Sequence, residues 1–208
     1  MMSPRRTVAE ARQTRAGIVR HGVAVASVEG LEGLTIGRLA ADLGMSKSGV
    51  LGHFGDKETL QLAVVELATD AFWRAVWEPV ADTPAGLPRL RAVAGSWLRY
   101  VASDALPGGC FFMAVGPEFD DRPGPVRSAI AGAADRWHRE LLHQARLAGH
   151  WPGEEAEQVV FELTGVLLAL HAAHRLRRDP SAATRAARAV DRLLVVPDRR
   201  TAPGGPVG

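Results

Sequence analysis

The chain has 208 residues, of which 47% are apolar, and its formal net charge is +2. This length allows one large domain or two small ones with a buried core. The longest apolar stretch, VVFELTGVLLALHAAH at 159–174, contains Glu162. It falls short of the roughly 20 apolar residues of a membrane helix. We therefore expect it to be a buried helix, and we expect no membrane partner.

The compartment is indicated by the cysteine content and by the first residues. A single cysteine, Cys110, excludes an internal disulfide and fits a reducing environment. The start, MMSPRRTVAEARQTR, has cations but no following apolar run, so it does not resemble a signal peptide. These features predict a cytoplasmic protein.

The charge is unevenly distributed along the chain. Residues 1–57 carry eight Lys or Arg and five Asp or Glu, and they include both lysines of the chain, Lys47 and Lys57. A mildly basic N-terminal third is compatible with a polyanionic partner such as DNA.

Helical spacing recurs along the sequence, and no strand-like alternation appears. Ile18, Gly22, Val25 and Val28 recur every three or four residues and predict a first helix. Glycine commonly ends helices, and Ser, Thr and Asp commonly begin them. The first helix should therefore end at Gly30 or Gly33. The next three should run from Thr35 to Gly44, from Ser46 to Gly55, and from Asp56 toward Trp77.

The remainder also reads as helical. Three prolines mark a loop at 79–88, and Leu90, Val93, Trp97 and Tyr100 indicate a helix after it. Turns are expected at 106–110 and 118–125, followed by helices at about 125–148, 154–177 and 181–194. The Pro- and Gly-rich end predicts a disordered tail at 197–208. We expect an all-α fold with an N-terminal helical domain at 1–57 and a second helical domain at 58–196.

The stretch LTIGRLAADLGMSKSGVLGHFGDKETL at 34–60 has the pattern of a helix-turn-helix. Gly44 can take the positive φ that the turn needs, and Ala40 is small enough for the helix crossing. The apolar inward positions are Ile36, Leu39, Leu43, Met45 and Val50. A plain helical hairpin has the same central pattern. The helices expected on both sides favour a DNA-binding unit, whose second helix would present Ser46, Lys47, Ser48 and Gly49.

In these residues the chain resembles the TetR family of bacterial transcriptional regulators. The resemblance is specific over about residues 14–67, and beyond them it rests on the all-helical architecture. It implies that Thr35 and Lys57 contact phosphates, that Ser46–Gly49 face the major groove, and that His53 contacts the DNA backbone. Lys47 would contact either a guanine or a phosphate. Leu51 and Gly52 depart from the family pattern, because many members have a phosphate-binding tyrosine and a larger polar residue there.

The resemblance also implies roles for the second domain. Members pair two long helices with their copies in a homodimer, and the wide apolar sector of the 154–177 helix is consistent with this. Candidate dimer residues are Trp137, Leu141, Val159, Leu163, Val166, Leu167 and Leu170. Aromatic residues would line a cavity for a small apolar or aromatic effector. Candidate ligand residues are Trp73, Trp97, Tyr100, Phe112 and Trp137.

The function predicted from the sequence is a homodimeric repressor that binds a palindromic operator and is released by a small molecule. Two alternatives remain open: a redox-responsive regulator that uses Cys110, and a helical enzyme containing a helix-turn-helix-like hairpin. Against the enzyme, no nucleophile–base set or phosphate-binding glycine loop is evident. His171 and His174 share a helix face, but no third metal ligand accompanies them, so we expect neither a metal nor a cofactor.

Overall fold

The computed structural model describes residues 8–195, and all regular structure within them is helical. The α-helices are α1 (Val8–Gly33), α2 (Ile36–Asp42), α3 (Lys47–Phe54), α4 (Lys57–Val76), α5 (Leu87–Ala102), α6 (Phe111–Val115), α7 (Pro125–Ala148), α8 (Glu155–Arg175) and α9 (Ala182–Leu193), with 3-10 turns η1 (Glu78–Val80) and η2 (Gly116–Glu118). The all-α prediction is confirmed. The predicted tail at 197–208 lies outside the described residues.

Three helices begin at the caps that the sequence predicts. The Thr35 side chain accepts a hydrogen bond from the Arg38 amide at 3.1 Å. Ser46 Oγ accepts one from the Gly49 amide at 3.0 Å, and the Asp56 carboxylate accepts one from the Thr59 amide at 2.7 Å. Each bond satisfies an amide that the first turn of a helix leaves unpaired, so the starts of α2, α3 and α4 are set locally.

Glycines with positive φ shape the first two helix ends. Gly44 has a φ of 63° and forms the turn between α2 and α3. Gly30 has a φ of 75° and kinks α1, but the helix resumes and continues to Gly33. At Gly30, where the sequence predicts one possible end, α1 bends and then continues for three more residues to Gly33. The 111–118 region also differs from expectation, because α6 and η2 lie between the two predicted turns.

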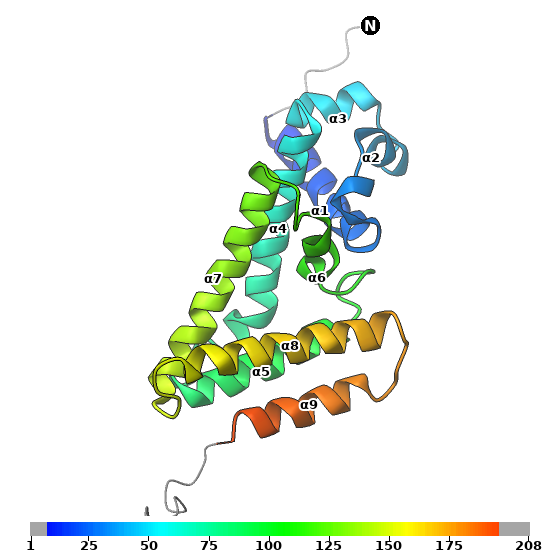
Figure 1. Cartoon of the computed structure of the whole chain (residues 1–208). Helices are drawn as coiled ribbons and strands as arrows, with labels where there is room; N and C mark the ends of the chain where they lie inside the picture. Colours follow the sequence, from blue (N-terminus) through cyan, green and yellow to red (C-terminus); the bar gives the residue numbers. More distant parts are fainter. Residues whose placement is uncertain (1–7, 196–208) are drawn as a thin grey trace, which may run out of the picture.

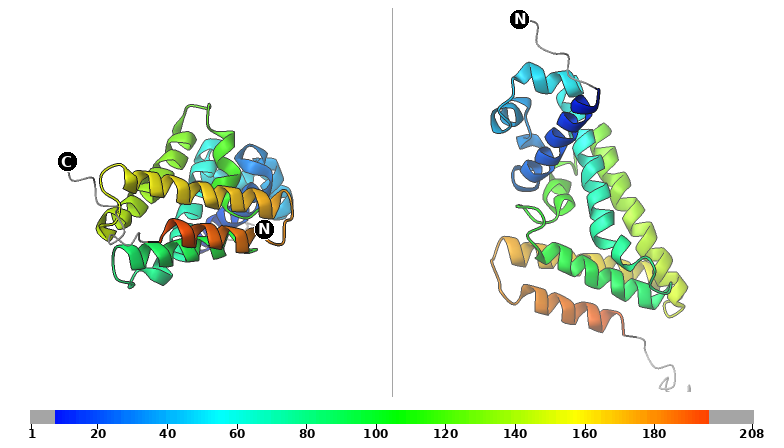
Figure 2. Two further views of the ribbon diagram at one scale, coloured as in Figure 1. Left: turned by 60° about the horizontal axis from the view of Figure 1, so that its bottom comes forward. Right: turned by 180° about the vertical axis from the view of Figure 1, so that it is seen from behind.

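The helices form two packed groups joined by long helices (Figure 1). Helices α1–α3 lie at one end of the molecule, and α5, α8 and α9 form layers at the other. Helices α4 and α7 pack together along the distance between them, as the view from behind also shows (Figure 2). Helix α4 begins at Lys57 beside the first group and ends beside α5 in the second.

The core has two clusters of buried apolar side chains. One lies between α4, α5, α7, α8 and α9. The other fills the space between α1–α4 and also receives Phe111, Val115, Phe119, Val126 and Ile130 from the second half of the chain. The core of the N-terminal group is therefore completed by residues well beyond 57, and the boundary at 57 remains a proposal.

Helix α8 is long and apolar enough to cross a membrane, by its length and composition alone. It has 21 residues and a mean hydropathy of 1.3 over its most apolar window. In the structure it packs against α5, α7 and α9, and Val160, Leu163 and Leu167 are fully buried. One side of α8 therefore lies in the core, and 39% of its most apolar window is buried.

Candidate DNA-binding surface and effector cavity

Helices α2 and α3 pack as a helix-turn-helix around a small apolar centre. Leu39 and Val50 are fully buried and Ala40 is 3% exposed, while Ile36, Leu43 and Met45 are partly buried against the same cluster. The burial of these positions fixes which side of α3 faces outward.

The outward side of α3 carries the small polar residues. Ser46, Lys47 and Ser48 are exposed at the amino end of α3, and Gly49 is half-buried. Ser46 Oγ lies 3.1 Å from Ser48 Oγ. Leu51 and Gly52 are also exposed, so the two departures from the family pattern lie on the surface and leave the packing intact.

His53 and Phe54 end α3 and connect it to α1. Phe54 is buried, and the Arg15 guanidinium of α1 lies 4.9 Å from the centroid of its ring. His53 is half-buried, with its ring centroid 6.4 Å from that of Phe54. Thr35 is exposed at the start of α2, where it is already engaged as a cap.

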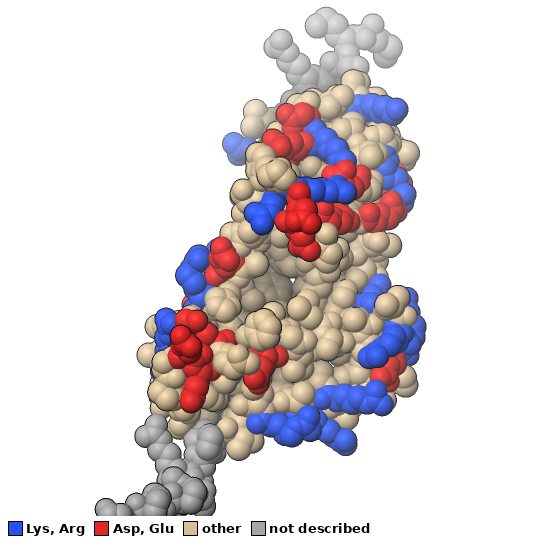
Figure 3. Space-filling model, viewed as in Figure 1, with Lys and Arg blue, Asp and Glu red and all other residues tan. Residues whose placement is uncertain are grey.

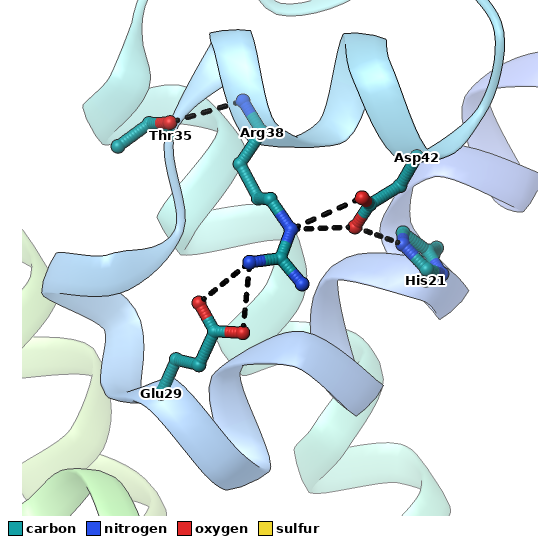
Figure 4. A network of polar contacts seen from close by, with 5 residues as sticks. All are labelled: His21, Glu29, Thr35, Arg38 and Asp42. Atoms are coloured by element: carbon teal, nitrogen blue, oxygen red, sulfur yellow. Dashed lines mark hydrogen bonds and ion pairs between the residues drawn. The ribbon is translucent and has the colours of Figure 1, made fainter.

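A polar network fixes α2 against α1 (Figure 4). The Arg38 Nε donates to the Asp42 carboxylate at 2.8 Å, and Arg38 Nη1 lies 3.0 Å from Glu29. His21 Nε2 lies 2.9 Å from Asp42 Oδ2. The hydrogen bonds from His21 and then Arg38 lower the pKa of Asp42. The network orients α2, the helix that precedes α3.

Asp42→Asn should destabilise the protein at neutral pH. The folded-state pKa of Asp42 lies below its ordinary value of 3.8, so its ionised form stabilises the fold above that value. This stabilisation is lost as pH falls through the lowered pKa. Thermal melting should show wild type above the variant at neutral pH and convergence under acid. Asp70→Asn is the control, because Asp70 is exposed and 3.9 Å from Arg74; an equal loss in both variants would contradict the role of the network.

Lys57 is held by α1 in this structure. Its Nζ donates to the Glu32 carbonyl oxygen at 3.1 Å and lies 3.4 Å from the Glu32 carboxylate. Arg122, from the second half of the chain, lies 3.6 Å from the same carboxylate. A phosphate that binds Lys57 would therefore compete with Glu32. Sequence reasoning missed this partner, which is 25 residues away.

The loop before α6 and the turn after it dock on the end of α1. The Gly108 amide donates to Ser27 Oγ at 3.0 Å, and a Cβ at Gly108 would overlap the Ser27 carbonyl oxygen. The Glu32 amide donates to Glu118 Oε2 at 3.2 Å. These contacts, which we call the α1–α6 joint, tie the helix-turn-helix group to the wall of the cavity described next.

A cavity of about 480 Å³ lies between α4, α5, α6, α7 and α8. Four of the five predicted ligand residues line it: Trp73, Trp97, Phe112 and Trp137. Tyr100 is not among the lining residues; its ring packs edge-on against Phe72, 5.4 Å between centroids. Burial, followed by the nearby Cys110, raises the pKa of Tyr100.

Sequence reasoning missed several lining residues. Phe72 lies at the centre, with its ring 4.8 Å from Trp137 and 6.1 Å from Trp97 between centroids. Phe72 and Trp73 are adjacent on α4, so helical periodicity predicts that only one of them faces the cavity. In the structure both of them line it. The polar lining residues Asp120, Asp135 and His138 and the α8 residues Thr164 and Leu168 come from distant segments. Figure 3 shows a hollow in the surface between α6, α7 and α8.

The residues that the sequence assigned to a dimer face lie inside the protomer. Six of them are buried: Trp137, Leu141, Val159, Leu163, Leu167 and Leu170. Val166 is half-buried against the same core. An apolar helix packs its most continuous stripe against its own chain, and within this protomer that stripe is covered by α5, α7 and α9. The exposed apolar side chains of α8 are instead Phe161, at 73% exposure, and Leu168, at 50%.

Cys110 is buried, and the two histidines of α8, His171 and His174, are half-buried. Cys110 is 2% exposed, and burial raises the pKa of its thiol, which disfavours the reactive thiolate. Burial, then Arg175 and His174, lower the pKa of His171. Within residues 8–195 there is no group of three or more His, Cys, Asp or Glu side chains arranged to hold a metal.

A helix-turn-helix on a helical body that carries a cavity open to the surface is the arrangement of DNA-binding transcriptional regulators. Residues 9–64 match the family model described as bacterial regulatory proteins of the tetR family. Residues 86–190 match the tetracyclin repressor-like C-terminal domain. The chain therefore belongs to the TetR family, and the resemblance found in the sequence is confirmed.

Solved structures share the fold at low sequence identity. A TetR transcriptional regulator from Chloroflexus aurantiacus is 23% identical, with a TM-score of 0.77 over 90% of this chain and 95% of that one. AibR in complex with isovaleryl coenzyme A and operator DNA is 22% identical, with a TM-score of 0.62 over 76% and 85%. A regulator from Saccharomonospora viridis in complex with choline is 18% identical, with a TM-score of 0.70 over 88% and 96%. No curated protein matches the chain.

Proposed function

We propose that this protein is a cytoplasmic homodimeric repressor that binds a palindromic operator and is released by a small apolar or aromatic molecule. The observation that carries the proposal is the course of α4. This helix begins at Lys57, beside the helix-turn-helix, and supplies Thr69, Phe72 and Trp73 to the cavity wall. A ligand that moves the cavity wall therefore has a direct route to the DNA-facing helices.

We divide the proposed DNA contacts into backbone contacts, which supply affinity, and base contacts, which select the sequence. Thr35, His53 and Lys57 are proposed to contact the DNA backbone, and Ser46–Gly49 are proposed to enter the major groove. The exposed amino end of α3 supports this assignment, because helix amino ends attract phosphate and small polar side chains allow close approach. One such unit covers few base pairs, so specific binding needs two units one helical turn apart.

The exposed side of α8 supports a homodimer. Phe161, Gly165, Leu168 and Ala172 recur at helical spacing on that side, and all four are exposed. Glu155, Glu157 and Glu162 lie in the first half of α8 and Arg175 ends it, with no Asp, Glu, Lys or Arg between Glu162 and Arg175. A two-fold copy that crosses α8 in the opposite direction would place acidic residues against basic ones. We therefore move the proposed dimer contact to Phe161 and Leu168.

The effector role is supported by the size and lining of the cavity. Its volume of about 480 Å³ is in the range of small-molecule sites. Isovaleryl coenzyme A and choline are bound by two proteins of the same fold, and we extend a ligand-binding role to this cavity. The redox alternative is not favoured, because the Cys110 thiol is buried.

Lys57→Ala should weaken binding to all DNA and flatten its salt dependence. Fluorescence anisotropy with the DNA flanking the gene, at several salt concentrations, should show the log–log slope falling by about one unit. Lys47→Ala should do the same if Lys47 contacts a phosphate, or lower affinity for one sequence only if it contacts a base. Salt-independent binding, or no binding even at low salt, would contradict the proposed function.

The ion pair between Lys57 and Glu32 allows a second test with the same binding assay. Glu32→Gln removes the carboxylate that lies 3.4 Å from Lys57 Nζ while keeping the size of the side chain. The variant should bind DNA at least as tightly as wild type, because Lys57 is then freer to meet a phosphate. Exposed ion pairs are weak, so the expected gain is no more than about fivefold. A loss of affinity would indicate that Glu32 positions Lys57 for DNA.

A further inference from the structure

The lining of the cavity carries negative charge and includes no lysine or arginine. Asp120 and Asp135 line it, and the other titratable side chains of the lining are His138 and the buried thiol of Cys110. With the imidazole neutral, the lining therefore holds two negative charges and no positive one. Two carboxylates alone define no site, but these two share the wall of a cavity whose other lining is largely apolar and aromatic.

Neither carboxylate is neutralised by a partner within the described part of the chain. The ion pairs found among those residues involve neither Asp120 nor Asp135. Arg127 Nε approaches Asp120 but donates to its backbone carbonyl oxygen, at 3.1 Å. Both aspartates are exposed, so they lie at the mouth of the cavity, where a cation can approach them from the solvent.

The aromatic rings of the cavity wall also accept a positive charge. Phe72, Trp97 and Trp137 are buried and line the cavity, and the face of such a ring attracts a cation. Trp73 already makes this contact within the protein, because the Arg136 guanidinium carbon lies 4.4 Å from the centroid of its ring. Arg136 lines two neighbouring surface grooves and not the cavity. The wall therefore offers apolar surface to the body of a ligand without repelling a positive group.

We propose that the cavity selects an organic cation, whose positive group lies beside Asp120 and Asp135 at the mouth. Its apolar or aromatic body packs against the buried rings. An anion of similar shape would meet like charge at the mouth, and a neutral molecule would gain no attraction from the carboxylates. This inference rests on the proposed function in taking the cavity as the effector site. It adds the charge of the effector and names the two residues that select it.

Three probes with one aromatic body and different charges test the proposal by isothermal titration calorimetry: naphthylmethyl-trimethylammonium, its uncharged carbon isostere neopentylnaphthalene, and naphthylacetate. Titration at about pH 8 keeps imidazole side chains neutral. At low salt the cation should bind about tenfold more tightly than the isostere, because two exposed carboxylates each add a weak attraction. Naphthylacetate should bind most weakly, and the preference for the cation should shrink as salt screens the carboxylates. Binding of the isostere or the anion as tight as that of the cation, or no binding of any probe, would overturn the proposal.

Asp120→Asn and Asp135→Asn remove the charges and keep the size of the side chains. The double variant should reduce the preference for the cation to about twofold or less, while its affinity for the isostere stays within about twofold of wild type. Asp121→Asn is the matched control, because Asp121 is also exposed, adjoins Asp120 and does not line the cavity; it should keep most of the preference. An unchanged preference in the double variant would exclude the carboxylates as the selecting groups. Both aspartates are exposed and unpaired, so the variants should melt like wild type.

Operator binding by the same preparations separates this proposal from the proposed function. Preference for the cation without operator binding would retain the ligand class and overturn the regulator. Operator binding without that preference would retain the regulator and overturn the ligand class.

Discussion

Phe161→Arg is expected to convert the protein from a dimer to a monomer and to lower specific operator affinity by about 100-fold or more. The Phe161 side chain is 73% exposed, so the change removes no packing within the protomer. In a two-fold dimer each arginine would lie near an apolar surface of the partner or near its own copy. Binding through two linked units exceeds binding through one by a large factor, and that factor is lost on dissociation.

Analytical ultracentrifugation and fluorescence anisotropy on the same samples measure the two effects. Val195→Arg is a matched control, because Val195 is a similarly exposed apolar residue, at 57%, that follows α9. The control should remain dimeric and bind the operator. A Phe161→Arg variant that remains dimeric with unchanged affinity would remove α8 from the proposed interface.

Leu163→Ala separates the dimer face that we propose from the one that the sequence suggested. Leu163 is fully buried, and truncation of such a leucine costs about 2–5 kcal/mol of stability. Its main effect should therefore be a lower melting temperature with the dimer retained. The contrast with Phe161→Arg arises because both residues lie on α8 but on opposite sides.

The local features of the fold could be read from the sequence. The caps Thr35, Ser46 and Asp56 each bond an amide three residues onward, and Gly44 has the positive φ that its turn requires. These interactions depend on neighbours in the chain, so the residue types indicate them directly. The bounds of α7, α8 and α9 lie within two residues of those predicted, although none of the three has a side-chain cap at its start.

The faces and partners of the helices could not be read in this way. Helix α8 has apolar residues on more than one side, and periodicity does not say which side the protomer itself covers. Tyr100 and Phe72 illustrate the same point at the cavity, since both are aromatic residues on inward-facing helices and only Phe72 lines it. The partner of Lys57 is set by the kink of α1 at Gly30, which brings Glu32 to the start of α4.

Gly108→Ala is expected to cause the second large effect, a loss of stability of about 3 kcal/mol or more. A Cβ at this position would overlap the Ser27 carbonyl oxygen and lie 2.8 Å from the Val28 amide nitrogen. These are backbone atoms of α1, so no side-chain rotation relieves the overlap. The buried bond from the Gly108 amide to Ser27 Oγ would also lengthen or break. For a chain of this size the melting temperature should fall by roughly 6–12 °C.

Gly132→Ala is the control for the replacement of a glycine by an alanine where there is room for the added Cβ. Gly132 lies within α7, and nothing is within 4 Å of a Cβ placed there. Alanine is the better helix former, so this variant should gain up to about 1 kcal/mol. If Gly108→Ala melted like wild type, the close packing of the α1–α6 joint would be contradicted.

The same variant tests how the cavity communicates with the DNA-binding end. Besides α7, whose Val126 and Ile130 complete the N-terminal core, two connections join them: α4, which runs the whole distance, and the α1–α6 joint, which attaches the cavity wall to α1. If the joint transmits the effector signal, the folded fraction of Gly108→Ala should bind operator DNA but show a reduced response to a cavity ligand. If α4 alone transmits it, the response should persist despite the lower stability. The ratio of operator affinities with and without naphthalene, an apolar aromatic probe, measured well below the melting temperature, distinguishes the two routes, because that ratio is the coupling between the sites.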